Sequence, residues 1–174
     1  MGHPDEVVDD PRRDELVHTL RLSLIPGVGP RTRQVLLERF GSAEAVLAAA
    51  PHELRGVSGV GPKLTGKITA AGDQIDVEEE MAVCEAHGIT ILTEADEQYP
   101  RVLREIPDPP GVLFVRGKLE PDDGLAVAIV GTRHATQYGL RQAERLAESL
   151  ARAGLTIVSG LARGIDAAAH RGAM

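Results

Sequence analysis

The chain has 174 residues, of which 43% are hydrophobic and 2% are aromatic, and it contains no tryptophan. Its single cysteine, Cys84, excludes an internal disulfide, and no apolar run approaches the roughly 18 residues that a membrane-spanning helix needs. The formal net charge of −7 argues against a general polyanion binder. These features predict a soluble cytoplasmic protein whose core is built from aliphatic side chains.

Residues 1–15 form an acidic, polar stretch that is expected to be a disordered tail. Residues 16–72 are expected to form a small helical domain that is broken by glycines. Within this domain, "IPGVGPRTR" at 25–33 is echoed by "VSGVGPKLT" at 57–65. A Gly-x-Gly turn between two helices has the form of a helix-hairpin-helix, whose exposed backbone N–H groups are ready to bind an anion such as a DNA phosphate.

The paired hairpins therefore give a set of candidate secondary DNA contacts. Their residues are Gly27, Gly29, Arg31, Gly59, Gly61 and Lys63. Arg33 lies in the same first helical turn as Arg31 and is expected to support the same contact. The alternative is a helical packing module that has the same hairpins and binds no ligand.

Residues 73–174 are expected to form part of a Rossmann-like α/β domain. An acidic helix at 73–88 is followed by short strands at 89–93 and 112–116. The apolar runs "LAVAIVGT" and "LTIVSG", which flank an amphipathic helix, are of the kind that is buried on both faces of a parallel sheet. This order predicts a parallel βαβ unit, and the two earlier strands are expected to extend the same sheet.

Glycine, hydroxyl and arginine residues follow both strands of this unit, in "VGTRHATQYG" and "SGLARGID". Ligands bind outside the carboxyl ends of the strands in an open parallel sheet, so these residues are expected to meet at one edge. Glycines admit a ligand close to the backbone, hydroxyls donate hydrogen bonds and arginines bind phosphate. The predicted DNA- or phosphate-binding residues are Gly131, Thr132, Arg133, Ser159, Gly160, Arg163 and Gly164.

These motifs, together with "YPRVLREIPDPPGVLFVRG" upstream, resemble the DNA-processing protein A family, known as DprA or Smf. The resemblance implies a sterile-alpha-motif-like (SAM-like) or helix-hairpin-helix domain followed by an extended Rossmann domain. It further implies a single-stranded DNA-binding mediator of natural transformation that helps to load the recombinase RecA, with no cofactor, no metal and no catalytic residue. The seven residues after the two strands match the phosphate-contacting positions of the family, with Thr132 where the family often has Ser.

The resemblance covers only the N-terminal half of the family. The Rossmann domain of the family continues past Met174, and its homodimer interface lies there, so the domain is expected to be truncated and to lack that interface. One alternative function is a Rossmann-like nucleotide hydrolase that cleaves N-glycosidic bonds. Another is a helical interaction scaffold that carries a degenerate Rossmann remnant.

Several other polar residues have simpler expected roles. Asp166 is expected to be a helix cap or an ion-pair partner of Arg163 rather than a catalytic acid. His134 and His170 are expected to be structural or to face DNA, because neither has a nucleophile nearby in the sequence. Tyr138 offers an aromatic face on which a base could stack.

Overall fold

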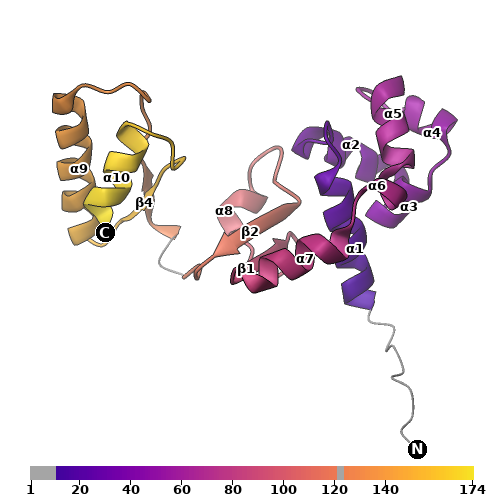
Figure 1. The fold of residues 1–174 in the computed structure, drawn as a ribbon, viewed down its shortest axis with the longest axis horizontal. Coiled ribbons are helices and arrows are strands. Elements are labelled where there is room, and N and C mark those ends of the chain that lie inside the picture. Colours follow the sequence, from indigo (N-terminus) through magenta and orange to yellow (C-terminus); the bar gives the residue numbers. More distant parts are fainter. Residues whose placement is uncertain (1–10, 121–123) are drawn as a thin grey trace, which may run out of the picture. The chain divides into compact units, whose positions relative to one another are not determined.

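The computed structural model describes residues 11–120 and 124–174, and it contains two compact units, Met1–Lys118 and Leu119–Met174 (Figure 1). Residues 1–10 of the predicted tail lie outside the described residues. Residues 11–15 are the first residues of helix α1, which spans Pro11–Leu24. Asp14 lies in its first turn, where a carboxylate is stabilised by the helix dipole. The domain boundary expected near residue 72 stays a prediction.

The first unit begins with the predicted helical region. After α1 come α2 (Pro30–Phe40), α3 (Ala43–Ala48), α4 (Pro51–Arg55), α5 (Pro62–Thr69) and α6 (Ala71–Gln74). These helices are short, so their stability comes mainly from a shared apolar core. The core consists of the buried residues Leu22, Ile25, Val28, Leu36, Ala43, Val46, Leu54, Val57, Val60, Ile68 and Ala71. The expected helix-hairpin-helix region is therefore present.

The same unit continues into a small antiparallel sheet. Helix α7 (Val77–Ala86), strand β1 (Ile89–Thr93), helix α8 (Arg101–Arg104) and strand β2 (Val112–Arg116) follow in order. Strand β1 pairs with β2 antiparallel, with Ile91 opposite Phe114. The prediction that these strands extend the parallel sheet was wrong, because β1 and β2 hydrogen-bond only to each other among the described residues.

The second unit is the predicted βαβ arrangement with one further helix. Strand β3 (Ala126–Ala128) pairs parallel with β4 (Thr156–Val158), and α9 (Gln137–Arg152) connects them. Helix α10 (Ile165–Ala173) follows β4 and packs along α9. The two helices approach closely because Gly172 has no side chain: a Cβ there would lie 2.1 Å from the carbonyl oxygen of Glu144.

The helices cover one face of this sheet. Ile129 and Ile157 pack against Ala147 and Ala169, whereas alternate residues point to the opposite face. On that face Val130 is 72% exposed and Val158 is 50% exposed. The apolar runs are of a kind that is covered on both faces of a parallel sheet, and among the described residues α9 and α10 cover one of these faces.

Within the two described stretches, none of the helices is both long enough and apolar enough to cross a membrane.

Candidate nucleic-acid interface

The loops that follow β3 and β4 are joined to each other. The backbone N–H of Ile165, the first residue of α10, donates to the carbonyl oxygen of Thr132 across 3.3 Å. The Ser159 hydroxyl donates to the carbonyl oxygen of Ile129 across 2.6 Å. Because the two parallel strands are neighbours, the predicted residues after each strand lie at the same sheet edge, as the sequence indicates.

Two of the predicted glycines serve the packing between these loops. Gly164 has φ +87°, and a Cβ there would lie 2.3 Å from the carbonyl oxygen of Thr132. A Cβ on Gly131 would lie 2.7 Å from Cγ1 of Ile165. The sequence predicts that these glycines let a ligand approach the backbone. In the structure, the space beside each glycine is instead filled by protein atoms.

The exposed cations of the site are Arg133 and Arg163, one on each loop. Neither has an ion-pair or hydrogen-bond partner within residues 11–120 and 124–174. Thr132 is also exposed, and its Oγ1 accepts the backbone N–H of His134 across 3.1 Å, which leaves its hydroxyl proton available. Ser159 differs from Thr132, because its proton is already donated to Ile129 and only its lone pairs remain for a ligand.

Asp166 is a structural part of this edge. Its side chain is buried at 6% exposure, and its Oδ1 accepts the backbone N–H of Gly131 across 3.2 Å. A Cβ on Gly160 would lie 3.0 Å from its other oxygen, Oδ2. In the described part of the chain, Asp166 forms no ion pair with Arg163, so that expected pairing is wrong and the carboxylate instead joins the two loops.

The β4 loop contains an unusual backbone conformation. Leu161 has φ +54°, and no other non-glycine residue within the described ranges has a positive φ. Its side chain is 77% exposed. A left-handed conformation costs a β-carbon-bearing residue roughly 1–2 kcal/mol, and such strained residues cluster at functional sites.

The two hairpins of the helical region share one geometry. Gly27 and Gly59 have positive φ (+107° and +85°), and each hairpin ends in a glycine N-cap followed by proline, at Gly29 and Gly61. The helix starts of α2 and α5 therefore present backbone N–H groups with no side-chain cap.

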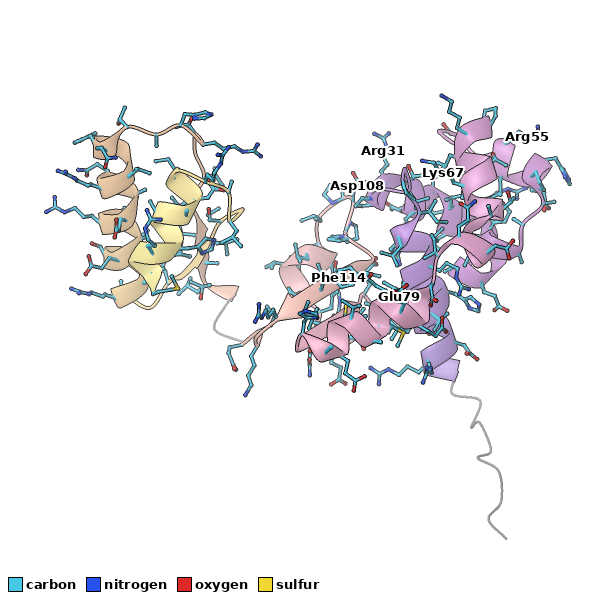
Figure 2. The ribbon with its side chains drawn as sticks, viewed as in Figure 1. Arg31, Arg55, Lys67, Glu79, Asp108 and Phe114 are labelled. Carbon is cyan, nitrogen blue, oxygen red and sulfur yellow. The ribbon has the colours of Figure 1, made fainter. Side chains whose placement is uncertain are left out.

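The two hairpins also touch each other. The Lys67 ammonium donates to the carbonyl oxygen of Pro26 across 2.8 Å, and a Cβ on Gly27 would lie 3.4 Å from Leu64. Figure 2 shows Arg31 and Lys67 on α2 and α5. Arg31 and Lys63 are exposed, as a phosphate contact requires.

Arg33 does not fit the phosphate contact that was expected of it. Its side chain is 13% exposed, and its guanidinium pairs with the Glu94 carboxylate across 2.6 Å. The side chain also lies against the backbone of Gly111, where a Cβ would be 2.1 Å from Nε. Arg33 is thus a packing residue that joins α2 to the end of β1.

Other candidate chemistry is limited. No group of three His, Cys, Asp or Glu side chains within the described ranges could hold a metal ion. A hollow of about 1030 Å³ lies beside α1, α7 and β1, and none of the predicted hairpin residues of the first unit lines it. Two of its lining residues, Arg12 and Asp96, pair with each other across 2.5 Å. The strand-end loops and the hairpins remain the candidate sites.

Comparison with known proteins shows which protein families this chain is similar to. The family model described as "DNA recombination-mediator protein A" matches residues 90–174, which run from β1 to the end of α10. Over these residues, which are just under half of the chain, the sequence matches the DprA/Smf family. A second model, a SAM-like helix-hairpin-helix tandem, matches residues 20–71, the part that contains both hairpins.

Members of the DprA/Smf family give matches along most of the chain. Protein Smf of Synechocystis is 37% identical over 160 residues, which cover 90% of this chain and 40% of that protein. DNA processing protein DprA of Bacillus subtilis is 41% identical over 91 residues, which cover 52% of this chain and 31% of that protein. The chain therefore spans less than half the length of these relatives.

The fold agrees with a solved DprA structure. The structure of DNA processing protein A from Streptococcus pneumoniae matches with a TM-score of 0.61 and 27% identity, over 92% of this chain and 53% of that chain. The family-matched segment includes both joined loops and so contains every predicted strand-end residue.

Proposed function

We propose that this chain binds single-stranded DNA at the strand-end loops of its second unit, through the sugar–phosphate backbone. The observation that carries the proposal is the pair Arg133 and Arg163, which are exposed and have no ion-pair partner among the described residues. The bond between Ile165 and Thr132 joins the two loops, so both cations are presented from one preorganised edge. Thr132 adds a hydroxyl donor beside them.

The biological role that fits this binding is that of a recombination mediator. Two matched relatives are named DNA processing protein DprA, and the matching family model is named for a recombination mediator. We therefore propose that the chain acts on DNA during natural transformation in the cytoplasm, assists RecA loading and performs no reaction of its own.

The hairpins are proposed as a secondary DNA contact. Their two uncapped helix starts and the exposed Arg31 and Lys63 support binding of phosphates without base recognition. Lys67 holds the hairpins together and is therefore a positioning residue in this scheme. If the hairpins are only a helical scaffold that does not contact DNA, substitution of Arg31 and Lys63 will not change the affinity for DNA.

The test is a titration of fluorescently labelled oligothymidine followed by anisotropy. Arg133→Ala/Arg163→Ala should weaken binding by about 2–4 kcal/mol, because two charge-assisted hydrogen bonds are removed. A matched variant, Arg116→Ala/Arg171→Ala, removes the same charge from exposed positions outside the site and should bind nearly as tightly as the wild type. Equal affinities of the two variants would refute the site.

A parallel assay tests whether the protein is instead a nucleotide hydrolase that cleaves N-glycosidic bonds. Nucleoside monophosphates incubated with the protein should release no free base above the rate in buffer, as measured by chromatography. Release of base that is lost in Arg133→Ala/Arg163→Ala would establish a nucleotide hydrolase at the same edge.

A further inference from the structure

Helix α9 carries a row of basic and aromatic side chains on its outer surface. Successive residues of an α-helix turn by about 100°. Ala143 and Ala147 are buried at 7% and 0% exposure, so they mark the face that packs against the sheet and α10. The residues on the opposite side of the helix form what we call the outer row. It consists of Tyr138, Arg141, Arg145, Ser149 and Arg152, all exposed.

The arginines of the outer row differ in whether an acidic side chain already pairs with them. Arg152 is paired with Glu148 across 2.6 Å, within the last turn. Arg141 and Arg145 have no ion-pair partner in the described part of the chain. Glu144 follows Arg141 by three positions and Glu148 follows Arg145 by three, but the ion pair that forms among these residues is the one between Glu148 and Arg152. Figure 2 shows nitrogen-tipped side chains leaving α9 on the side away from α10.

The aromatic member of the row is unusually accessible. Tyr138 is 74% exposed, although aromatic side chains are rare in this chain. It lies in the first turn of α9, whose start is fixed by the Thr136 hydroxyl oxygen accepting the backbone N–H of Gly139 across 3.1 Å. That turn directly follows the loop that carries Arg133, so the outer row begins beside the strand-end site.

We infer that the outer row of α9 is a second binding segment for single-stranded DNA, which continues the path of a strand that leaves the strand-end loops. Arg141 and Arg145 would contact successive phosphates, and Tyr138 would stack on a base between the two segments. The inference rests on the proposed function. The row is about 20 Å long, which corresponds to about six nucleotides at the spacing of one strand in a duplex.

Oligonucleotide length and salt dependence test the two arginines. Arg141→Gln/Arg145→Gln should bind an oligothymidine of about 20 nucleotides roughly tenfold more weakly than the wild type, and one of about 6 nucleotides equally well. The slope of log affinity against log salt should decrease in magnitude by about 1.4 with the longer strand, as expected for two lost single-strand phosphate contacts. Arg116→Gln/Arg171→Gln is the charge-matched control, and the unfolding midpoints of both variants are measured to establish that they are folded.

The outcomes separate this inference from the proposed function. If the outer-row variant equals its control at both lengths while Arg133→Gln/Arg163→Gln loses affinity, the outer row is refuted and the strand-end site stands. If only the outer-row variant loses affinity, the strand-end site is refuted, and so is the inference that the outer row continues a strand leaving that site. A wild-type chain that binds neither oligonucleotide refutes both.

Tyrosine fluorescence tests the stacking step separately. The chain has no tryptophan and two tyrosines, of which Tyr99 is 2% exposed and Tyr138 is 74% exposed. Long oligothymidine should quench the emission of the wild type, and Tyr138→Phe should lose the quenching while it keeps its affinity. Tyr138→Ala should lose about tenfold in affinity as well. Quenching that persists in Tyr138→Phe would refute the stacking role.

Discussion

The Arg33 guanidinium and the Glu94 carboxylate form an ion pair across 2.6 Å, although 61 positions separate them in the sequence. Their side chains are 13% and 33% exposed. The pair joins α2, which follows the first hairpin, to the residue directly after β1. The Gly111 backbone closes the space beside the guanidinium, so this side chain contacts both the residue after β1 and the residue before β2.

Arg33→Ala should destabilise the first unit by about 1–3 kcal/mol, because it leaves the partly buried Glu94 carboxylate without its partner. The measurement is urea unfolding followed by circular dichroism. Arg31→Ala, two residues earlier and exposed, is the matched control and should change the free energy of unfolding by less than about 0.5 kcal/mol. Equal effects of the two substitutions would contradict the packing role of Arg33.

Gly164→Ala should cost more stability than Gly154→Ala, although both residues have nearly the same φ, +87° and +85°. A Cβ on Gly154 meets no atom within 4 Å, so only backbone strain of about 1 kcal/mol is expected. A Cβ on Gly164 would lie 2.3 Å from the Thr132 oxygen, so the loops must separate. We expect an additional loss of about 1–3 kcal/mol in thermal or urea unfolding. A Gly164→Ala protein as stable as Gly154→Ala would mean that the loops are not tightly joined.

Asp166→Ala should destabilise the second unit by about 1–3 kcal/mol, because the buried Asp166 carboxylate and its hydrogen bond from the backbone N–H of Gly131 are lost. Asp166→Asn keeps an acceptor oxygen and should lose less. The readout is hydrogen exchange of the Gly131 amide by NMR, which should accelerate in Asp166→Ala more than in Asp166→Asn. Unchanged protection in Asp166→Ala would show that the carboxylate does not hold this loop.

The stability of the first unit should fall on acidification because of Asp96. The pKa of Asp96 lies below its ordinary value of 3.8, mainly because the backbone N–H of Thr93 donates to its Oδ2 across 2.7 Å, with Arg12 and the Thr93 hydroxyl contributing. The folded state thus favours the carboxylate, so Asp96 adds stability above the unfolded pKa, and this stability is lost as the pH falls through the lower folded pKa.

Urea unfolding at a series of pH values between about 6 and 3 checks this expectation. The Asp96→Asn variant should be less stable than the wild type at pH 6, and the difference should shrink towards pH 3. A difference that stays constant over this range would exclude Asp96 as the group responsible.

The features that the sequence predicts well are local ones. Each hairpin is specified by a Gly-x-Gly-Pro segment, in which glycine permits the positive φ of Gly27 and Gly59 and proline favours the helix start. The parallel pairing of β3 and β4 follows from an apolar strand, an amphipathic helix and a second apolar strand. The meeting of the two strand-end loops follows in turn from that pairing.

The features that the sequence does not predict depend on contacts between distant residues. Arg31 and Arg33 look equivalent in sequence, but two residues turn a helix by about 200°, so one faces solvent while the other reaches Glu94. The order of strands also does not reveal that β1 and β2 pair antiparallel with each other. The bond from Gly131 to Asp166 spans 35 positions and has no local pattern.

The left-handed backbone of Leu161 has a consequence for how this loop can change. Replacement by glycine would relieve roughly 1 kcal/mol of strain, and it would remove an apolar side chain that is 77% exposed at the proposed interface. Selection for a more stable protein would favour that replacement, whereas selection for ligand contact at this loop would retain the side chain. Leu161 is therefore the position at which a screen for heat resistance and a screen for DNA affinity should select opposite residues.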